Sequence, residues 1–399
     1  MKELEMNPYV IQIDKFVNSL GKLSRFFLSL EERKPLYFEV EDWNACEDIK
    51  DRLWEQKMSL NREGCAVQLD AFAQMIQHST HELDASIFAD EHLEKKLKTK
   101  MGKIGIKLLS SVFFVTENGR YEIHVTVRAM KGYCVETREL ARIISKCAGR
   151  TMCPEKNEKI AVGNEYCTIS FVESTVFHTL QGVAKIGKGC DKISGDNFSM
   201  IELPGGKQGI ILSDGMGAGE GANRESTMVV EVLEELLEAG FPKETAFQML
   251  NTALVIGREE IRFSTVDMSL FDLYTGKCEI VKAGASTTFL KRGNCVEGIR
   301  STSLPLGVVS KLELDQTELE LQDGDMLIMV TDGVMDALPV GEQDLLMRMI
   351  MEGTNLQNPK EMAHHVLEQV LECSGEVPLD DMTVLVVGIW SLEKSKKII

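Results

Sequence analysis

The sequence has no apolar run of the length that a lipid bilayer requires. Its longest apolar stretches, such as Met382 to Trp390, have the length of a strand and fall far short of the roughly 20 residues of a membrane-spanning helix. The chain begins without a basic, apolar leader, so no secretory signal is indicated. We therefore expect the chain as given to be soluble and cytoplasmic.

Positive charge is also scarce. The 399 residues include 44 Lys and Arg against 62 Asp and Glu, which gives a net charge of −18 at pH 7. A surface this acidic repels the phosphates of nucleic acids and of anionic lipids, so we expect no nucleic-acid partner. A hydrophobic fraction of 44% with 27% charged residues is typical of a folded globular protein. The length predicts two or three domains.

The ten cysteines lack the close pairing of a zinc site or a disulfide framework. None belongs to a Cys-x-x-Cys pair, and several lie in apolar runs, as Cys147 does. Reduced thiols in a cytosolic protein explain this pattern. The sequence also shows no Ser-His-Asp arrangement and no Cys-x5-Arg phosphate loop, so neither class of nucleophile is indicated.

Changes in hydrophobic periodicity divide the chain into four parts. Apolar residues at helical spacing predict a helical regulatory or linker segment over residues 1–100. Two β-rich runs joined by an Asn-Gly turn, with a helix after them, predict a small α/β regulatory unit over 101–172. From 173 to 391 short strands are interrupted by two pairs of helices, and 392–399 form a tail. This order predicts an α+β fold in which helices cover antiparallel sheet.

One pair of aspartates flanks a predicted hairpin. Asp196 immediately precedes one strand and Asp214 immediately follows the next. The midpoint between them lies in the turn Pro204-Gly-Gly-Lys207. An antiparallel hairpin therefore places the two carboxylates side by side at its open end.

A second pair repeats this arrangement. Asp332 ends the predicted strand over residues 326–331, and Asp381 precedes the predicted strand over 383–389. If these strands pair antiparallel, they too bring two carboxylates to one sheet edge. Small residues flank both pairs and let the backbone approach a ligand.

Carboxylates gathered in this way repel one another at neutral pH unless a cation binds. Hard oxygen ligands, supplemented by backbone carbonyls and water, suit Mg²⁺ or Mn²⁺. Two such ions about 3.5–4 Å apart can share a water, lower its pKa and polarise a phosphoryl group for in-line attack. The pattern predicts a two-metal hydrolase site.

At these residues the sequence resembles the metal-dependent type 2C protein serine/threonine phosphatases. The matching blocks, which cover about residues 175 to 391, are Ser194-Gly-Asp-Asn197, Ser213-Asp-Gly-Met-Gly217, Lys282-Ala-Gly-Ala285, Ser303-Leu-Pro-Leu-Gly307, Asp323 to Val334 and Asp380-Asp-Met-Thr-Val384. The segment Ala141 to Met152 and the Gly-rich Ser213 to Gly221 narrow the resemblance to the stage II sporulation phosphatase E family of endospore-forming bacteria.

The resemblance implies an αββα sandwich with two Mn²⁺ or Mg²⁺ ions at one end. It implies that Asp214 contacts both metals and that Gly215 offers its carbonyl. Asp332 and Asp381 would complete the cluster, with Asp196 on its rim. Asp214, Asp332 and Asp381 are thus the expected catalytic residues.

The resemblance also implies partners. The substrate would be a phosphoserine protein, namely a phosphorylated anti-anti-sigma factor whose dephosphorylation frees a sporulation sigma factor. Members of the narrower family interact with a tubulin-like division protein and carry an N-terminal domain that spans the membrane several times. This chain shows no such spans, so we expect a soluble fragment or a shortened homologue, and a homodimer or a higher oligomer.

One departure from the broader family concerns the general acid. Many relatives have a His shortly after the Asp-Gly-Met-Gly motif, suited to protonate the leaving alkoxide, whereas Ala218-Gly-Glu-Gly-Ala222 occupies that stretch here. Glu220 is one candidate, although a solvated loop carboxylate is the simpler interpretation of it. Metal-bound water is the other source of the proton.

Two alternative functions stay open. A strand over 209–213, the Gly-rich Gly217 to Ala222 and a following helix resemble a dinucleotide fingerprint, although Asp214 would repel a pyrophosphate. The domain could instead be a catalytically inactive, phosphatase-like interaction module. Loss of a metal-ligating aspartate would indicate that module, yet all four positions are filled.

Other residues receive structural interpretations. Asp267 and Asp272 alternate with apolar residues and are expected on the solvent face of a strand. The methionines at 347, 349 and 351 are expected to fill gaps in a core.

Overall fold

The computed structural model describes residues 87–88, 90–115, 119–155, 158–203, 205–217, 219–256, 263–309, 312–375 and 377–392. These residues form two compact units that divide between Thr175 and Val176. Nearly all of the predicted helical segment 1–100 and of the tail 392–399 lies outside the described residues. The helix α3 (Glu91–Lys103) crosses the predicted boundary at residue 100. No helix in the described part of the chain is long and apolar enough to cross a membrane.

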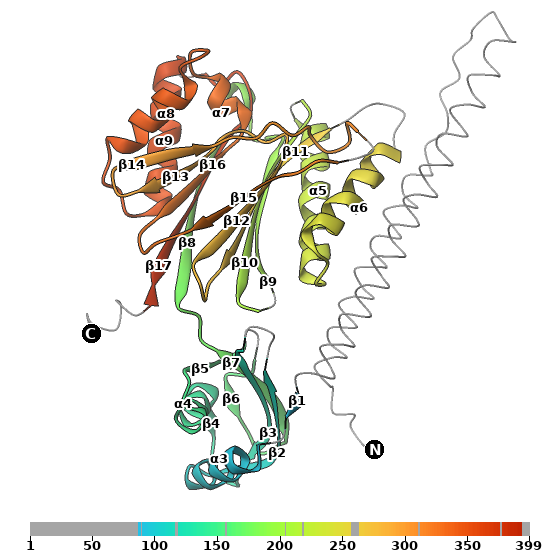
Figure 1. Ribbon diagram of the computed structural model, residues 1–399, viewed down its shortest axis with the longest axis vertical. Helices are drawn as coiled ribbons and strands as arrows, with labels where there is room; N and C mark the ends of the chain where they lie inside the picture. The colour runs from blue at the N-terminus through green and yellow to red at the C-terminus, as the bar shows by residue number, and fades with distance from the viewer. Residues whose placement is uncertain are drawn as a thin grey trace, which may run out of the picture. The chain divides into compact units, whose positions relative to one another are not determined.

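The first unit is a sheet with two helices packed against it (Figure 1). Its strand order is β1-β2-β3-β7-β5, and the strands are β1 (Ile87–Phe88), β2 (Ile106–Val115), β3 (Tyr121–Ala129), β5 (Met152–Pro154) and β7 (Cys167–Glu173). The short strands β4 (Val135–Glu136) and β6 (Ala161–Val162) pair with each other. Helix α4 (Thr137–Ala148) buries Leu140, Ala141 and Ile144, and it ends where Gly149 adopts a left-handed φ of 72°. The predicted β-hairpin and helix are therefore present.

The second unit contains two five-stranded sheets in the orders β15-β12-β11-β10-β9 and β14-β13-β16-β17-β8. Its strands are β8 (Phe177–Ile186), β9 (Asp196–Leu203), β10 (Lys207–Gly215), β11 (Ser264–Asp272), β12 (Lys277–Ala283), β13 (Thr288–Arg292), β14 (Cys295–Ile299), β15 (Asp315–Glu320), β16 (Met326–Val330) and β17 (Met382–Ser391). All of their pairings are antiparallel.

Helices cover the outer face of each sheet (Figure 1). Helices α5 (Glu220–Glu238) and α6 (Lys243–Ile256) lie on the side of the first sheet, and α8 (Gln343–Glu352) and α9 (Pro359–Ser374) lie on the side of the second. The short helix α7 (Asp332–Asp336) follows β16. The predicted α+β class and the αββα sandwich are confirmed.

Side-chain alternation along the strands builds the layers. Leu385 and Val387 of β17 join the cluster between the two sheets, whereas Val384 and Val386 join the cluster under α8 and α9. Every residue of β16 is buried, as expected of a strand covered on both faces. Of the three methionines on α8, Met347 and Met351 are buried, whereas Met349 is exposed.

The interpretation of Asp267 as a solvated residue is wrong. Asp267 is 1% exposed, and its carboxylate accepts a hydrogen bond from Lys282 Nζ at 2.5 Å and another from the Thr288 hydroxyl. The two charged residues are register partners on β11 and β12, so their side chains share one sheet face, and the second sheet covers that face. The alternation of polar and apolar residues shows which side chains share a face of the strand, but it cannot show that other layers of the fold bury both faces. Asp272 is partly buried and accepts a hydrogen bond from the Tyr274 amide at 2.9 Å.

We expect Lys282→Met to lower the free energy of unfolding by about 3–5 kcal/mol, because it leaves the Asp267 carboxylate buried without its cation. The double variant Lys282→Met/Asp267→Leu should recover most of this loss, since it removes both charges. Urea unfolding, followed by amide hydrogen exchange of β11 and β12, measures both effects. Equal stability of the single and double variants would contradict this role of the ion pair.

Candidate metal centre

Two strand pairs bring four aspartates to one end of the sandwich. Asp196 and Asp214 are register partners on β9 and β10, as the hairpin argument predicted. Strands β16 and β17 also pair antiparallel, with Val330 opposite Val384. Asp332 follows β16 as the first residue of α7, and Asp381 directly precedes β17.

Hydrogen bonds join the two pairs across the sheets. Asp196 is fully buried, and its Oδ2 accepts from the hydroxyls of Thr331 at 3.0 Å and Thr383 at 2.7 Å. Asp381 is 3% exposed and accepts from two backbone amides, that of Lys188 at 2.8 Å and that of Gly195 at 2.6 Å. Asp381 therefore holds the loop that leads from β8 to β9.

Asp214 contacts the carboxyls of both Asp196 and Asp332. Its burial, followed by the negative charges of these two neighbours, raises the pKa of Asp214 to about 10. Burial likewise raises the pKa of Asp196 to about 6, although the hydrogen bonds from the two threonines act in the opposite direction. Desolvation of the carboxyl raises the pKa of Asp332, even though that residue as a whole is exposed. Without a cation, the cluster therefore favours the protonated form of the Asp214 carboxyl.

The cluster fits a hard divalent cation. The Oδ1 atom of Asp196 is buried and has no hydrogen-bond partner among the residues that the structure describes, and a buried acceptor left in this state costs about 1–3 kcal/mol. A cation would satisfy this oxygen and would also remove the repulsion that raises the pKa of Asp214. Within the described ranges, no three His, Cys, Asp or Glu side chains are arranged as a formed metal site. The metal-ligating roles of the four aspartates and of the Gly215 carbonyl stay predictions.

Two glycines let the backbone close around the cluster. A Cβ atom at Gly215 would lie 2.4 Å from the carbonyl oxygen of Ala222, and one at Gly333 would lie 2.1 Å from the carbonyl oxygen of Asp381. Each glycine directly follows an aspartate of the cluster. Close backbone packing therefore requires glycine at both positions.

Three residues of the site were missed by the sequence reasoning. Thr331 and Thr383 orient Asp196, and each lies next to or near a motif aspartate in the sequence. Lys185 lies opposite Thr383 in the β8–β17 pairing and donates from Nζ to the Asp196 carbonyl at 2.5 Å. Burial lowers the pKa of Lys185, whereas the charges of Asp196 and Asp381 act to raise it. Only the pairing of β8 with β17, which the sequence did not reveal, places this lysine at the site.

The first turn of α5 is tied to the same hairpin. The side-chain Nδ2 of Asn223 donates to the Ser194 carbonyl at 2.7 Å, and the side-chain Nδ2 of Asn197 donates to the Ser226 hydroxyl at 2.8 Å. Glu220, the candidate general acid, is exposed at the start of this helix. Its role as the general acid stays a prediction.

The dinucleotide fingerprint is contradicted by the sheet. Strand β10 pairs antiparallel with both β9 and β11, whereas the fingerprint requires a parallel βαβ unit. Helix α5 is followed by α6 and then by the antiparallel β11. The Gly-rich stretch therefore does not belong to a dinucleotide-binding unit.

Comparisons with known proteins agree with this geometry. Residues 204–390 match the family model described as "Stage II sporulation protein E (SpoIIE)". The chain is 28% identical over 339 residues to stage II sporulation protein E of Bacillus subtilis (strain 168), and 27% identical over 390 residues to that of Priestia megaterium. These alignments cover 84% and 97% of this chain, but 40% and 64% of the relatives. The chain thus spans less than two thirds of the length of either relative.

A solved structure is similar over both units. It contains the PP2C phosphatase domain and a fragment of the regulatory domain of SpoIIE from Bacillus subtilis, with a TM-score of 0.65 and 25% identity. The match covers 88% of this chain and 99% of that chain. The resemblance to the type 2C phosphatases and to stage II sporulation protein E is therefore confirmed.

Without divalent cations, we expect the free energy of unfolding to fall as the pH rises. The folded state keeps protons that the unfolded state releases above the ordinary carboxyl pKa of about 4. The stability tied to Asp196 is therefore lost between about pH 4 and about 6, and that tied to Asp214 between about pH 4 and about 10. Thermal unfolding of the metal-stripped protein at several pH values measures this slope, and Asp214→Asn should flatten it.

At neutral pH, we expect Mn²⁺ to raise the melting temperature of the wild type and to release protons, because the ion displaces the proton held by Asp214. Asp214→Asn should lose both effects, whereas Glu361→Gln, an exposed change on α9, should keep them. Titration calorimetry in two buffers of different ionisation enthalpy counts the protons. If neither Mn²⁺ nor Mg²⁺ changed the melting temperature of the wild type, the proposed fit of the aspartate cluster to a divalent cation would be contradicted.

Proposed function

We propose that the second unit, residues 176–392, is a metal-dependent protein phosphatase that hydrolyses phosphoserine on a protein substrate. The observation that carries this proposal is the aspartate cluster, in which burial and the neighbouring carboxyls raise the pKa of Asp214. In the same cluster, a buried oxygen of Asp196 has no hydrogen-bond partner among the described residues. Both features are relieved by divalent cations. The type 2C fold and the match to the stage II sporulation protein E family support the reaction class.

The proposed ligands of two Mn²⁺ or Mg²⁺ ions are Asp196, Asp214, Asp332 and Asp381, together with the carbonyl of Gly215. Bound divalent cations supply positive charge to the phosphoryl oxygens and lower the pKa of an attacking water. Because the ligands are carboxylates, the same residues set a hard-ion preference and exclude a soft metal.

Other residues of the chain position this cluster. Thr331 and Thr383 fix the Asp196 carboxylate through one oxygen and leave the other oxygen free to bind an ion. Lys185 brings a positive charge to the edge of the cluster, where we propose that it contacts a phosphoryl oxygen of the substrate. Glu220 or water supplies the proton for the departing seryl oxygen.

The identity of the substrate is a finer proposal. We propose a phosphorylated anti-anti-sigma factor, whose dephosphorylation activates a sporulation sigma factor. The similarity to stage II sporulation protein E supports this choice, whereas the site geometry supports only the reaction class. On the same ground we propose a homodimer or higher oligomer, a tubulin-like division protein as a further partner, and a cytoplasmic location with membrane anchoring as in full-length family members.

We expect the wild type to release phosphate from a phosphoserine protein only with Mn²⁺ or Mg²⁺. Asp332→Asn should lower kcat/KM by at least about 100-fold, because a bound metal supplies several kcal/mol of transition-state stabilisation. Glu361→Gln, which removes an exposed carboxylate from α9, is the matched control and should retain the wild-type rate. Phosphate release that needs no metal and is unchanged in Asp332→Asn would contradict the proposal. No release from any phosphoserine protein would favour the inactive interaction module.

We expect Lys185→Met to raise KM for phosphorylated substrates by about tenfold, because one charge-assisted hydrogen bond to phosphate is lost. The same change should lower the Mn²⁺ concentration needed for half-maximal activity, since a positive charge next to the cluster is removed. Lys185→Arg should restore KM in part. Steady-state kinetics at several Mn²⁺ concentrations separate the two effects, and an unchanged KM would exclude the phosphate contact.

A further inference from the structure

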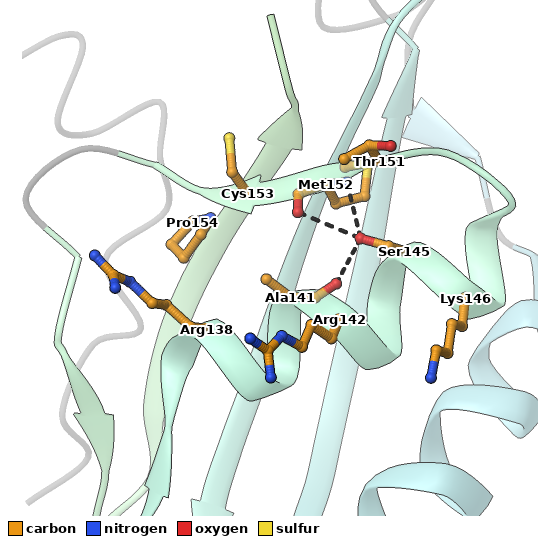
Figure 2. A pocket seen from close by; sticks show the side chains of 9 residues that line it. All are labelled: Arg138, Ala141, Arg142, Ser145, Lys146, Thr151, Met152, Cys153 and Pro154. Atoms are coloured by element: carbon orange, nitrogen blue, oxygen red, sulfur yellow. Dashed lines mark hydrogen bonds between the residues drawn. The ribbon is translucent and has the colours of Figure 1, made fainter. Parts of the chain in front are cut away.

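A groove on the first unit combines a cationic rim with an apolar floor. It lies between helix α4 and strand β5 and has a volume of about 460 Å³ (Figure 2). It is lined by Arg138, Ala141, Arg142, Ser145, Lys146, Thr151, Met152, Cys153 and Pro154. None of these residues belongs to the aspartate cluster, so the groove is separate from the candidate metal centre.

The rim carries three positive charges in one row. Arg138, Arg142 and Lys146 follow one another at intervals of four residues on α4, so they share one face of the helix over about 12 Å. All three are exposed. Among the residues that the structure describes, none of them forms an ion pair. In a chain with a net charge of −18, this row is a local concentration of positive charge.

The floor of the groove is apolar. Ala141 and Met152 are buried beneath it, and Cys153 and Pro154 form part of its wall (Figure 2). A groove of this kind accepts an apolar side chain of a ligand, whereas the rim selects for negative charge beside that side chain.

The strand beside the groove is closed to backbone pairing. β5 is the edge strand of its sheet, and an edge strand normally offers free amides to an incoming strand. Here the Met152 amide donates to the Ser145 hydroxyl at 2.9 Å, and that hydroxyl also lies 3.3 Å from the Met152 carbonyl (Figure 2). Pro154 has no amide hydrogen. A ligand of this groove must therefore be recognised through its side chains and not by addition of a strand.

From these features we propose that the groove docks an acidic amphipathic helix of a partner protein. Carboxylates spaced four residues apart on such a helix are about 6 Å apart along its axis, which matches the spacing of Arg138, Arg142 and Lys146. An apolar side chain between them enters the groove over Ala141 and Met152. The ligand is a protein, because the apolar floor of the groove accepts an apolar side chain, which a polyphosphate lacks. Three cations also fall below the four to eight that mark lipid-binding clusters.

The test uses a fluorescein-labelled synthetic helical peptide with Glu at every fourth position and Leu on the same face, titrated with the full chain. At low salt, we expect Arg138→Gln/Arg142→Gln to weaken binding by about tenfold, since two charge pairs are lost. The control Lys96→Gln/Lys100→Gln removes the same charge at the same spacing from exposed positions of α3 and should change binding less than about twofold. Fluorescence anisotropy measures the binding, and circular dichroism checks that each variant is folded.

Two altered peptides separate the contributions of charge and groove. Replacing Glu by Gln in the peptide should abolish the difference between wild type and the double variant, and replacing the central Leu by Ser should weaken binding to both. Equal losses in the α4 and α3 variants would overturn the proposal, because binding would then follow total charge alone. Failure of the peptide to bind, or tighter binding of phosphatidylglycerol vesicles or single-stranded DNA that depends on Arg138 and Arg142, would overturn it as well.

Discussion

Mutual repulsion among carboxylates at one end of the sandwich is the constraint on which the second unit depends. Antiparallel pairing forces Asp196 against Asp214, and the facing sheet adds Asp332 and Asp381. Burial makes this repulsion costly, as the raised pKa of Asp214 shows. The surrounding hydroxyls and amides hold the carboxylates in place without neutralising them. The fold therefore maintains a cluster of carboxyls that favours the protonated form of Asp214 and would favour a bound cation.

Much of this arrangement could be predicted from the sequence, because it follows from local rules. The turn at Pro204 to Lys207 fixes the register of one hairpin, and register alone places Asp196 opposite Asp214. Strand β14 was missed, because its five residues, Cys295–Ile299, mix glutamate and glycine with only two clearly apolar side chains. Its pairing with β13 crosses the two-residue turn Gly293-Asn294, in which Gly293 has a φ of 58°, and this local hairpin signal was also missed.

What could not be predicted depends on contacts between distant strands. Lys185 reaches Asp196 because β8 pairs with β17, which lies about two hundred residues later in the chain. Asp267 is buried because the second sheet covers the face that it shares with Lys282. Side chains that alternate along a strand show which residues share a face of the sheet. Whether that face is buried depends on which other layer of the sandwich packs on it.

The two glycines that follow Asp214 and Asp332 have an evolutionary consequence. Neither contributes a side chain to chemistry, yet a single added methyl group at either position would collide with a backbone oxygen at 2.4 Å or 2.1 Å. If the proposed activity were lost in a descendant, Asp214 and Asp332 could be replaced, but the glycines would still be needed to keep the backbone packed. Persistence of glycine beside a lost aspartate would therefore mark a descendant that has kept the scaffold after giving up the reaction.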